Sequence, residues 1–293
     1  MVGSVERINQ DIAALDQTTA AMAKELHTIY SGYLTLLGKA VRQQLILASY
    51  HVCTQGYPEE FLRLSYNQRQ SIQATLRQLA QQVQEELLAQ LHVPVVVESR
   101  EEATATEALP TAYMTTLAAE AVSETVLAEP TPSQPRTLTP QDLANWRDEL
   151  EQAIAAELRT ASHAANRLLQ QAGVLPKRLP EPVLEAATKA DLSEVGSSST
   201  PNLLNLLVEA TSDRPPDAEE PEHPRSQGVM HIVAIHLRLS EIEFADAAVG
   251  ASRNQLRQYF ARLKQLTREY QKKQRERAIA EAQAAWRSTW ADD

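Results

Sequence analysis

Cysteine, glycine and aromatic residues are scarce in this sequence. Its 293 residues include 1 cysteine, 8 glycines and 3 phenylalanines, and aromatic residues make up only 5% of the chain. A single cysteine excludes an internal disulfide framework, and so few glycines leave no candidate for a glycine-rich phosphate loop. Much of the apolar fraction is alanine, which adds little burial. The composition therefore argues against one large compact core.

Long apolar runs are also missing. No apolar run reaches the roughly 18 to 20 residues that are needed to cross a bilayer. The opening stretch, MVGSVERINQ, carries its first charge at Glu6 and lacks the apolar stretch of a secretory signal peptide. We therefore expect a soluble, cytoplasmic protein.

The residue combinations typical of catalytic or metal sites are absent from the sequence. A zinc site needs about four Cys or His ligands close together, whereas the 7 histidines are scattered and none has a recognised ligand spacing. His51 precedes Cys53 by two residues. Residues i and i+2 of a helix point about 200° apart, so the pair cannot act as nucleophile and base unless the helix ends before His51. We expect Cys53 to be a small buried residue. We predict a protein that is not an enzyme, with no cofactor, metal or evident small-molecule substrate.

The first forty residues carry the clearest positive pattern, with apolar residues at alternating spacings of three and four. This pattern predicts a coiled-coil-like seam that associates with itself or with a helix of a protein partner. The alternative is an ordinary amphipathic helix in a bundle. Gly32 and Gly38 weaken the helix locally and indicate a kink or a close helix crossing. The predicted partner-binding seam consists of Ile8, Ile12, Leu15, Met22, Leu26 and Ile29.

The sequence after this seam predicts a helical hairpin over residues 1–92. Gly56 and the following Pro58 are typical of a helix end. Ser65, with Gln68 three residues later, forms the capping-box pattern that begins a second long helix. The turn is expected near residues 56–64. The residues expected to contact the second helix are Leu45, Leu47 and Tyr50.

The middle of the chain alternates between acidic linkers and helical stretches. Residues 93–138 and 212–228 are rich in acids and proline, a composition that predicts disorder. Between them we predict a central helical segment, 139–211. Its first helix has Thr139 as N-cap and ends at Gly173. Further helices are expected over 182–194 and from Thr200 onward, where Pro201 occupies the first helical position.

The last block, 229–293, is predicted to be a C-terminal helical hairpin. Residues 229–239 fit either a strand or one face of a helix, and we favour a helix because no convincing partner strand is evident. Gly250 is expected to break this helix, and Ser252 with Gln255 to cap the final one. The predicted fold class is all-α, with long helical hairpins, coiled-coil-like packing and acidic disordered linkers. Whether the two terminal hairpins pack together stays open.

Basic residues are concentrated in the final helix, although the chain as a whole has a formal net charge of -10. A basic helix with aromatic residues can bind nucleic-acid phosphates or lie on an anionic membrane. It can equally be a solvated face that complements the acidic linkers, or a protein contact in which the tryptophans are anchors. The basic and aromatic surface consists of Arg268, Lys272, Lys273, Arg275, Arg277, Trp286 and Trp290.

Both ends of the chain resemble an uncharacterised family of helical cyanobacterial proteins. The resemblance is carried by GYLTLLGKAVRQQLILASYHVCTQGYPEEFLRLSYNQRQ and by LRLSEIEFADAAVGASRNQLRQYFARLKQLTREYQKKQRERAIAEAQAAWRSTW. It implies a helical fold and no known activity. The functional expectation is a non-enzymatic helical interaction or scaffold protein. The alternative is nucleic-acid or anionic-membrane binding through the basic C-terminal helix.

Overall fold

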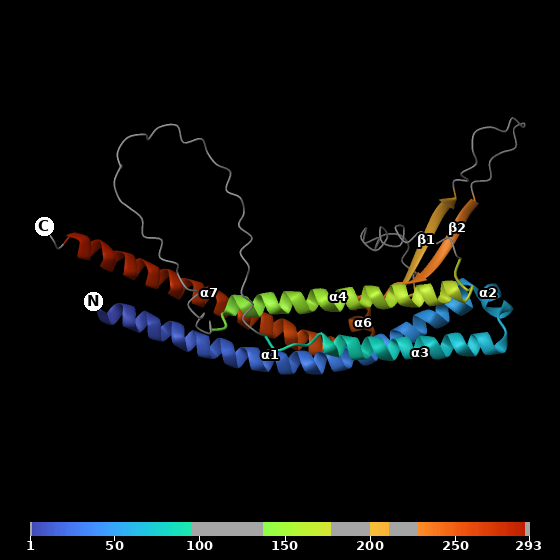
Figure 1. Ribbon diagram of the computed structural model, residues 1–293, viewed down its shortest axis with the longest axis horizontal. Coiled ribbons are helices and arrows are strands. Elements are labelled where there is room, and N and C mark those ends of the chain that lie inside the picture. Colours follow the sequence, from blue (N-terminus) through green and yellow to red (C-terminus); the bar gives the residue numbers. More distant parts are fainter. Residues whose placement is uncertain (1, 95–136, 177–199, 211–227, 291–293) are drawn as a thin grey trace, which may run out of the picture.

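The computed structural model describes residues 2–94, 137–176, 200–210 and 228–290. This part of the chain is mostly helical, and its long helices pack side by side, as the sequence predicted (Figure 1). The two predicted acidic linkers lie almost entirely outside the described residues. The helix predicted over 182–194 lies wholly outside them.

The first half of the described chain is a helical hairpin. Helix α1 (Val2–His51) continues into one π-helical turn, η1 (Val52–Gly56), and after the short helix α2 (Pro58–Arg63) the chain returns along α1 as α3 (Tyr66–Ala89). The two long helices cross closely at Gly38, where an added Cβ would lie 2.8 Å from Cγ of Gln84. The glycine thus marks a close crossing, one of the two roles predicted for it.

The predicted caps at Ser65 and Thr139 and the predicted stop at Gly173 are confirmed. The Ser65 hydroxyl accepts from the backbone N–H of Gln68, whose side chain accepts from the backbone N–H of Ser65. Thr139 and Asp142 form the same reciprocal pair at the start of α4 (Pro140–Gln171). Helix α4 ends before Gly173, which has a φ of 81°, a left-handed conformation that glycine adopts at low cost.

The helix predictions for residues from Thr200 to 210 and for 229–235 are wrong. These segments are the strands β1 (Leu203–Ala210) and β2 (Gly228–Ile235), paired antiparallel with Leu203 opposite Ile235. The sequence prediction rejected a strand because no partner strand was evident, and each of these segments supplies the partner of the other. Two strands are marginal by themselves, and here the inner half of the hairpin is buried against the helices.

The predicted C-terminal hairpin is also corrected. The chain after β2 forms only a short helix, α6 (Leu239–Ala245), before the long helix α7 (Ala247–Trp290). Helix α7 begins ahead of Gly250 and Ser252, because Oδ1 of Asp246 accepts from the backbone N–H groups of Ala248 and Val249. An aspartate in this position satisfies two free donors of the first turn and makes the predicted serine cap unnecessary.

Helix α7 packs along α1 rather than along a neighbouring helix of its own block. It runs antiparallel to α1 and also contacts α4, while α3 and α4 pack against each other (Figure 1). The N-terminal and C-terminal segments therefore share one bundle, which answers the question that the sequence left open.

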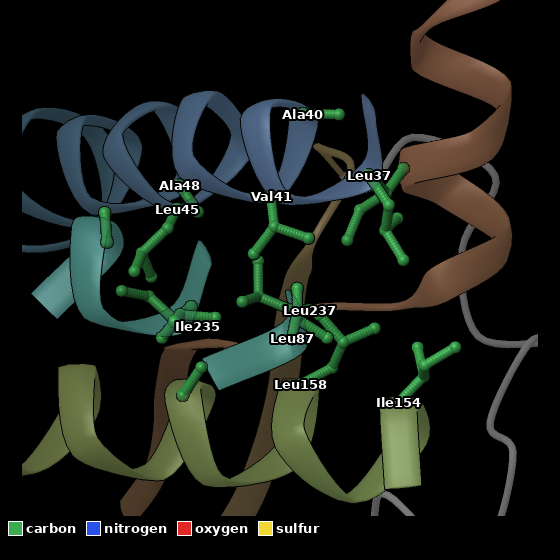
Figure 2. Packing of buried hydrophobic residues seen from close by; sticks show 14 of the residues in the cluster. Leu37, Ala40, Val41, Leu45, Ala48, Leu87, Ile154, Leu158, Ile235 and Leu237 are labelled. Atoms are coloured by element: carbon green, nitrogen blue, oxygen red, sulfur yellow. The ribbon is translucent and has the colours of Figure 1, made fainter. Parts of the chain in front are cut away.

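The core lies where α1 meets α3, α4 and the end of β2. Its members are buried, mostly aliphatic side chains, together with aromatic residues such as Tyr30, Tyr33 and Trp146. In Figure 2 side chains of all these elements point toward one another. They include Val41, Leu45, Leu87, Leu158, Ile235 and Leu237.

Candidate interaction surfaces

A partly buried network of charged and phenolic groups connects α1, α4, α6 and α7. The guanidinium of Arg253 holds both carboxylate oxygens of Glu151, with Nη2 2.9 Å from Oε2, and its Nε lies 3.1 Å from Oε1 of Glu243. Tyr30 donates to Glu151 and Tyr33 donates to Glu243, each at 2.7 Å. One cation thus neutralises two acids, and the two tyrosines occupy further acceptor sites.

The protonation states in this network are fixed by its surroundings. Burial, followed by the charge and hydrogen bond of Glu151, raises the pKa of Tyr30. Burial and the hydrogen bond to Glu243 raise the pKa of Tyr33. Burial alone would lower the pKa of Arg253, but the hydrogen bonding and charge of Glu151 outweigh it, so the pKa is raised. At neutral pH the two phenols therefore stay protonated and the guanidinium of Arg253 stays charged.

The outer edge of β2 is closed by side chains of the helical bundle. The side-chain amide of Asn166 donates to the carbonyl of Ile235 and accepts from its N–H, both at 2.8 Å. The hydroxyl of Tyr57 accepts from the N–H of Val233 at 3.1 Å. Asn166 thus reproduces the hydrogen bonding of a neighbouring strand, and the hairpin is held by polar contacts that sequence periodicity does not reveal.

The predicted partner-binding seam faces the interior of the molecule. Leu26 is buried in the main core, and Ile12 is buried further along α1. Met22 and Ile29 are half-buried against the core. Ile8 and Leu15 are half-buried as well. The apolar stripe of α1 is therefore largely occupied by helices of the same chain.

Beyond the start of α4, only α1 and α7 continue within the described part of the chain (Figure 1). We call this two-helix extension the arm and define it as residues 2–22 of α1 and 270–290 of α7. Lys273 joins its helices through an ion pair of 3.0 Å to Asp11. The α1 side of the arm has three acids and one arginine, whereas the α7 side has five bases and two acids.

Two cations of the predicted basic and aromatic surface form ion pairs within the chain. Lys273 pairs with Asp11 and Glu276, and Arg277 pairs with Glu281. Trp286 is 66% exposed. Trp290 lies at the end of α7, and its side chain is outside the described part. The exposed cations of this surface are Arg268, Lys272 and Arg275.

An exposed apolar surface lies at the turn between α1 and α3. Leu45 is buried as expected, whereas Leu47 and Tyr50 are 46% and 58% exposed. Tyr50 nevertheless lies next to α3, because it lines a pocket together with residues of that helix. This pocket has a volume of about 310 Å³. Its lining residues are Ile46, Ser49, Tyr50, Cys53, Thr54, Phe61, Ile72, Gln73, Leu76 and Arg77.

Cys53 forms part of this pocket and is only 6% exposed. Burial raises the pKa of its thiol to about 11, which keeps the sulfur protonated at neutral pH. Nδ1 of His51 is buried without a hydrogen-bond partner in the described part of the chain. Nδ1 of His51 therefore makes no hydrogen bond to Cys53.

The described residues contain no group of three or more His, Cys, Asp or Glu side chains that could hold a metal ion. None of the helices described is both long and apolar enough to span a bilayer. The pocket beside Tyr50 and the Arg253 network were not predicted. The only sequence signal for the pocket was that Ile46 and Tyr50 fall outside the regular seam of α1.

Comparison with known proteins adds no further assignment. No protein-family model matches this chain, and neither a curated protein nor a solved structure does. The resemblance to helical cyanobacterial proteins stays a prediction, and function has to be argued from the surfaces described above.

Proposed function

We propose that this protein is a non-enzymatic helical interaction protein of the scaffold type, and that two copies associate through their arms. The observation that carries the proposal is that, among the residues with described positions, only two helices make up the arm. Two helices alone cannot cover all the apolar side chains they carry. Ile8, Leu15 and Met22 stay half-buried, and Ile279 is 49% exposed.

The charges of the arm favour a second copy as the partner. The α1 side is acidic and the α7 side is basic, so two arms related by a two-fold axis would place each basic helix against an acidic one. Such a self-complementary surface is typical of symmetric dimers. Charge complementarity across an interface selects the partner and its orientation more than it adds affinity.

The test is the mass of the full chain measured by light scattering as a function of concentration. We expect Ile279→Glu to weaken association at least about tenfold, because it places a charge in an apolar contact. Leu62→Glu is the matched control, since Leu62 is 68% exposed on α2, far from the arm. A variant Ile279→Glu that associates as strongly as the wild type, with unchanged helicity, would contradict the proposal.

A second candidate function is binding of anionic polymers or membranes through α7. It is favoured by the exposed Arg268, Lys272 and Arg275, which lie on one helix of an otherwise acidic chain. Binding to single-stranded RNA, or to phosphatidylglycerol vesicles, should then weaken steeply with salt and be lost in Lys272→Glu/Arg275→Glu. Lys39→Glu is the control on α1. No binding at low salt would exclude this candidate.

A further inference from the structure

The pocket between the ends of α1 and α3 has the size of a ligand site. Its volume of about 310 Å³ is roughly twice that of the apolar cavities of about 150 Å³ that hold benzene. Four elements contribute to its lining: α1, the π-helical turn η1, α2 and α3. π-helical turns occur frequently at functional sites.

The interior of this pocket is apolar. Ile72 and Leu76 of α3 are buried, and Cys53 contributes its protonated thiol. Two of the three hydroxyl groups of the lining use their protons elsewhere, and the third belongs to Tyr50, which is 58% exposed. Ser49 donates to the carbonyl of Leu45 at 2.7 Å, and the hydroxyl of Thr54 donates to the carbonyl of Tyr50 at 2.8 Å. An alkyl chain can therefore fill this space without leaving the hydroxyl protons of Ser49 and Thr54 unsatisfied.

One exposed wall of the pocket carries a positive charge. Gln73 and Arg77 lie four residues apart on α3, so their side chains are neighbours on one helix face. Both are exposed, and none of the ion pairs in the described part of the chain involves Arg77. The lining contains no acidic residue.

We propose that this pocket binds a small apolar molecule with an anionic end group, of the size and chemistry of a medium-chain carboxylic acid. The alkyl chain occupies the space between Ile46, Ile72 and Leu76. The carboxylate accepts hydrogen bonds from the guanidinium of Arg77, a charge-assisted contact. This site is separate from the arm, so the proposal does not depend on self-association.

An apolar side chain of a partner protein is the competing occupant. The enclosed end of the pocket at Cys53 and the lone cation favour the small anion, because a partner helix would bury Tyr50 and Leu47 without needing an arginine. The purified chain alone distinguishes the two occupants: a pocket reserved for a protein side chain does not prefer a carboxylate over a cation of equal chain length.

Cys53 is the chain's single cysteine, so its alkylation by N-ethylmaleimide reports on the occupancy of this pocket alone. The rate is measured on the full chain with increasing dodecanoate, dodecanol or dodecyltrimethylammonium, each below its micelle concentration. We expect dodecanoate to slow alkylation in a saturable way and to bind about tenfold more tightly than the cation, as an added charge-assisted hydrogen bond predicts.

Substitutions in the lining test whether dodecanoate binds in this pocket. Arg77→Ala should abolish the preference for dodecanoate over dodecanol, while Arg63→Ala, a change to an exposed arginine outside the lining, should leave it intact. Gln73→Trp alters an exposed residue and should reduce saturable protection by filling the pocket. The proposal is overturned if dodecanoate leaves the alkylation rate unchanged, if the cation protects equally well, or if Arg77→Ala behaves as Arg63→Ala does.

Discussion

Arg253 of α7 holds Glu151 of α4 through two parallel hydrogen bonds, although 102 residues separate them in the sequence. The same guanidinium reaches Glu243 of α6 and lies 5.6 Å from the ring centre of Tyr33 on α1. Four helices thus meet at one cation. The two carboxylates accept hydrogen bonds from this guanidinium, and Tyr30 and Tyr33 donate to the same carboxylates. The network therefore fixes the position of the C-terminal helix relative to α1 and α4.

Removing this cation should destabilise the fold strongly. We expect Arg253→Met to lower the free energy of unfolding by about 3 kcal/mol, because two partly buried carboxylates lose their partner. The measurement is urea denaturation followed by circular dichroism. The control is Arg257→Met, which changes an exposed arginine one turn further along α7 and should stay within about 0.5 kcal/mol. Equal effects of the two substitutions would show that the network adds no stability.

A pair of glutamates between α3 and α4 should make stability depend on pH. Burial, together with the hydrogen bond and charge of Glu86, raises the pKa of Glu157 to about 7 from its ordinary 4.5. Oε1 of Glu157 is buried and receives no hydrogen bond within the described chain, so the protonated, uncharged form of Glu157 is favoured beside Glu86. The folded state retains this proton where the unfolded chain has lost it.

The direction of the pH dependence follows from the higher pKa that Glu157 has in the folded state. Stability from Glu157 is fully present below pH 4.5 and is lost as the pH rises toward 7. Glu157→Gln should therefore be more stable than the wild type at pH 8, with the advantage shrinking toward pH 5. Thermal unfolding at several pH values measures this. Glu149→Gln changes an exposed acid of α4 and should show no such trend. A constant difference between Glu157→Gln and the wild type would refute the assignment.

The strand hairpin should depend on a single asparagine. Asn166→Ala leaves the buried N–H and carbonyl of Ile235 without partners, at a cost of about 2 to 4 kcal/mol for two such groups. Amide hydrogen exchange should accelerate at Ile235 and Val233 before it does in α3. Arg167→Ala, at an exposed neighbouring position, is the control. Unchanged protection of Ile235 in Asn166→Ala would show that another contact holds β2.

Short sequence patterns predicted several helix ends. The capping pairs at Ser65 and Thr139 and the stop at Gly173 involve residues close in sequence, so their pattern was sufficient. Strand pairing was missed because the partner of residues 228–235 lies 18 or more residues away and looked helical by itself. The stripe of α1 predicted a partner helix but could not identify it as α7.

The candidate sites were predicted less completely than the helices. The basic character of α7 is visible in the sequence, but Lys273 and Arg277 turned out to be paired within the chain. The pocket at Cys53 depends on how α2 and η1 turn the chain over the end of α3. No periodicity encodes that geometry, so it becomes visible only in three dimensions.

The most direct test of arm-mediated self-association is cross-linking between isotopically distinct copies. Light and heavy protein are mixed, treated with a lysine-reactive reagent and analysed by mass spectrometry. The account predicts mixed-isotope links that join Lys272 or Lys273 of one copy to Lys24 of the other, because a basic α7 faces an acidic α1. Mixed links confined to Lys39, or only links between residues of the same isotope, would contradict it.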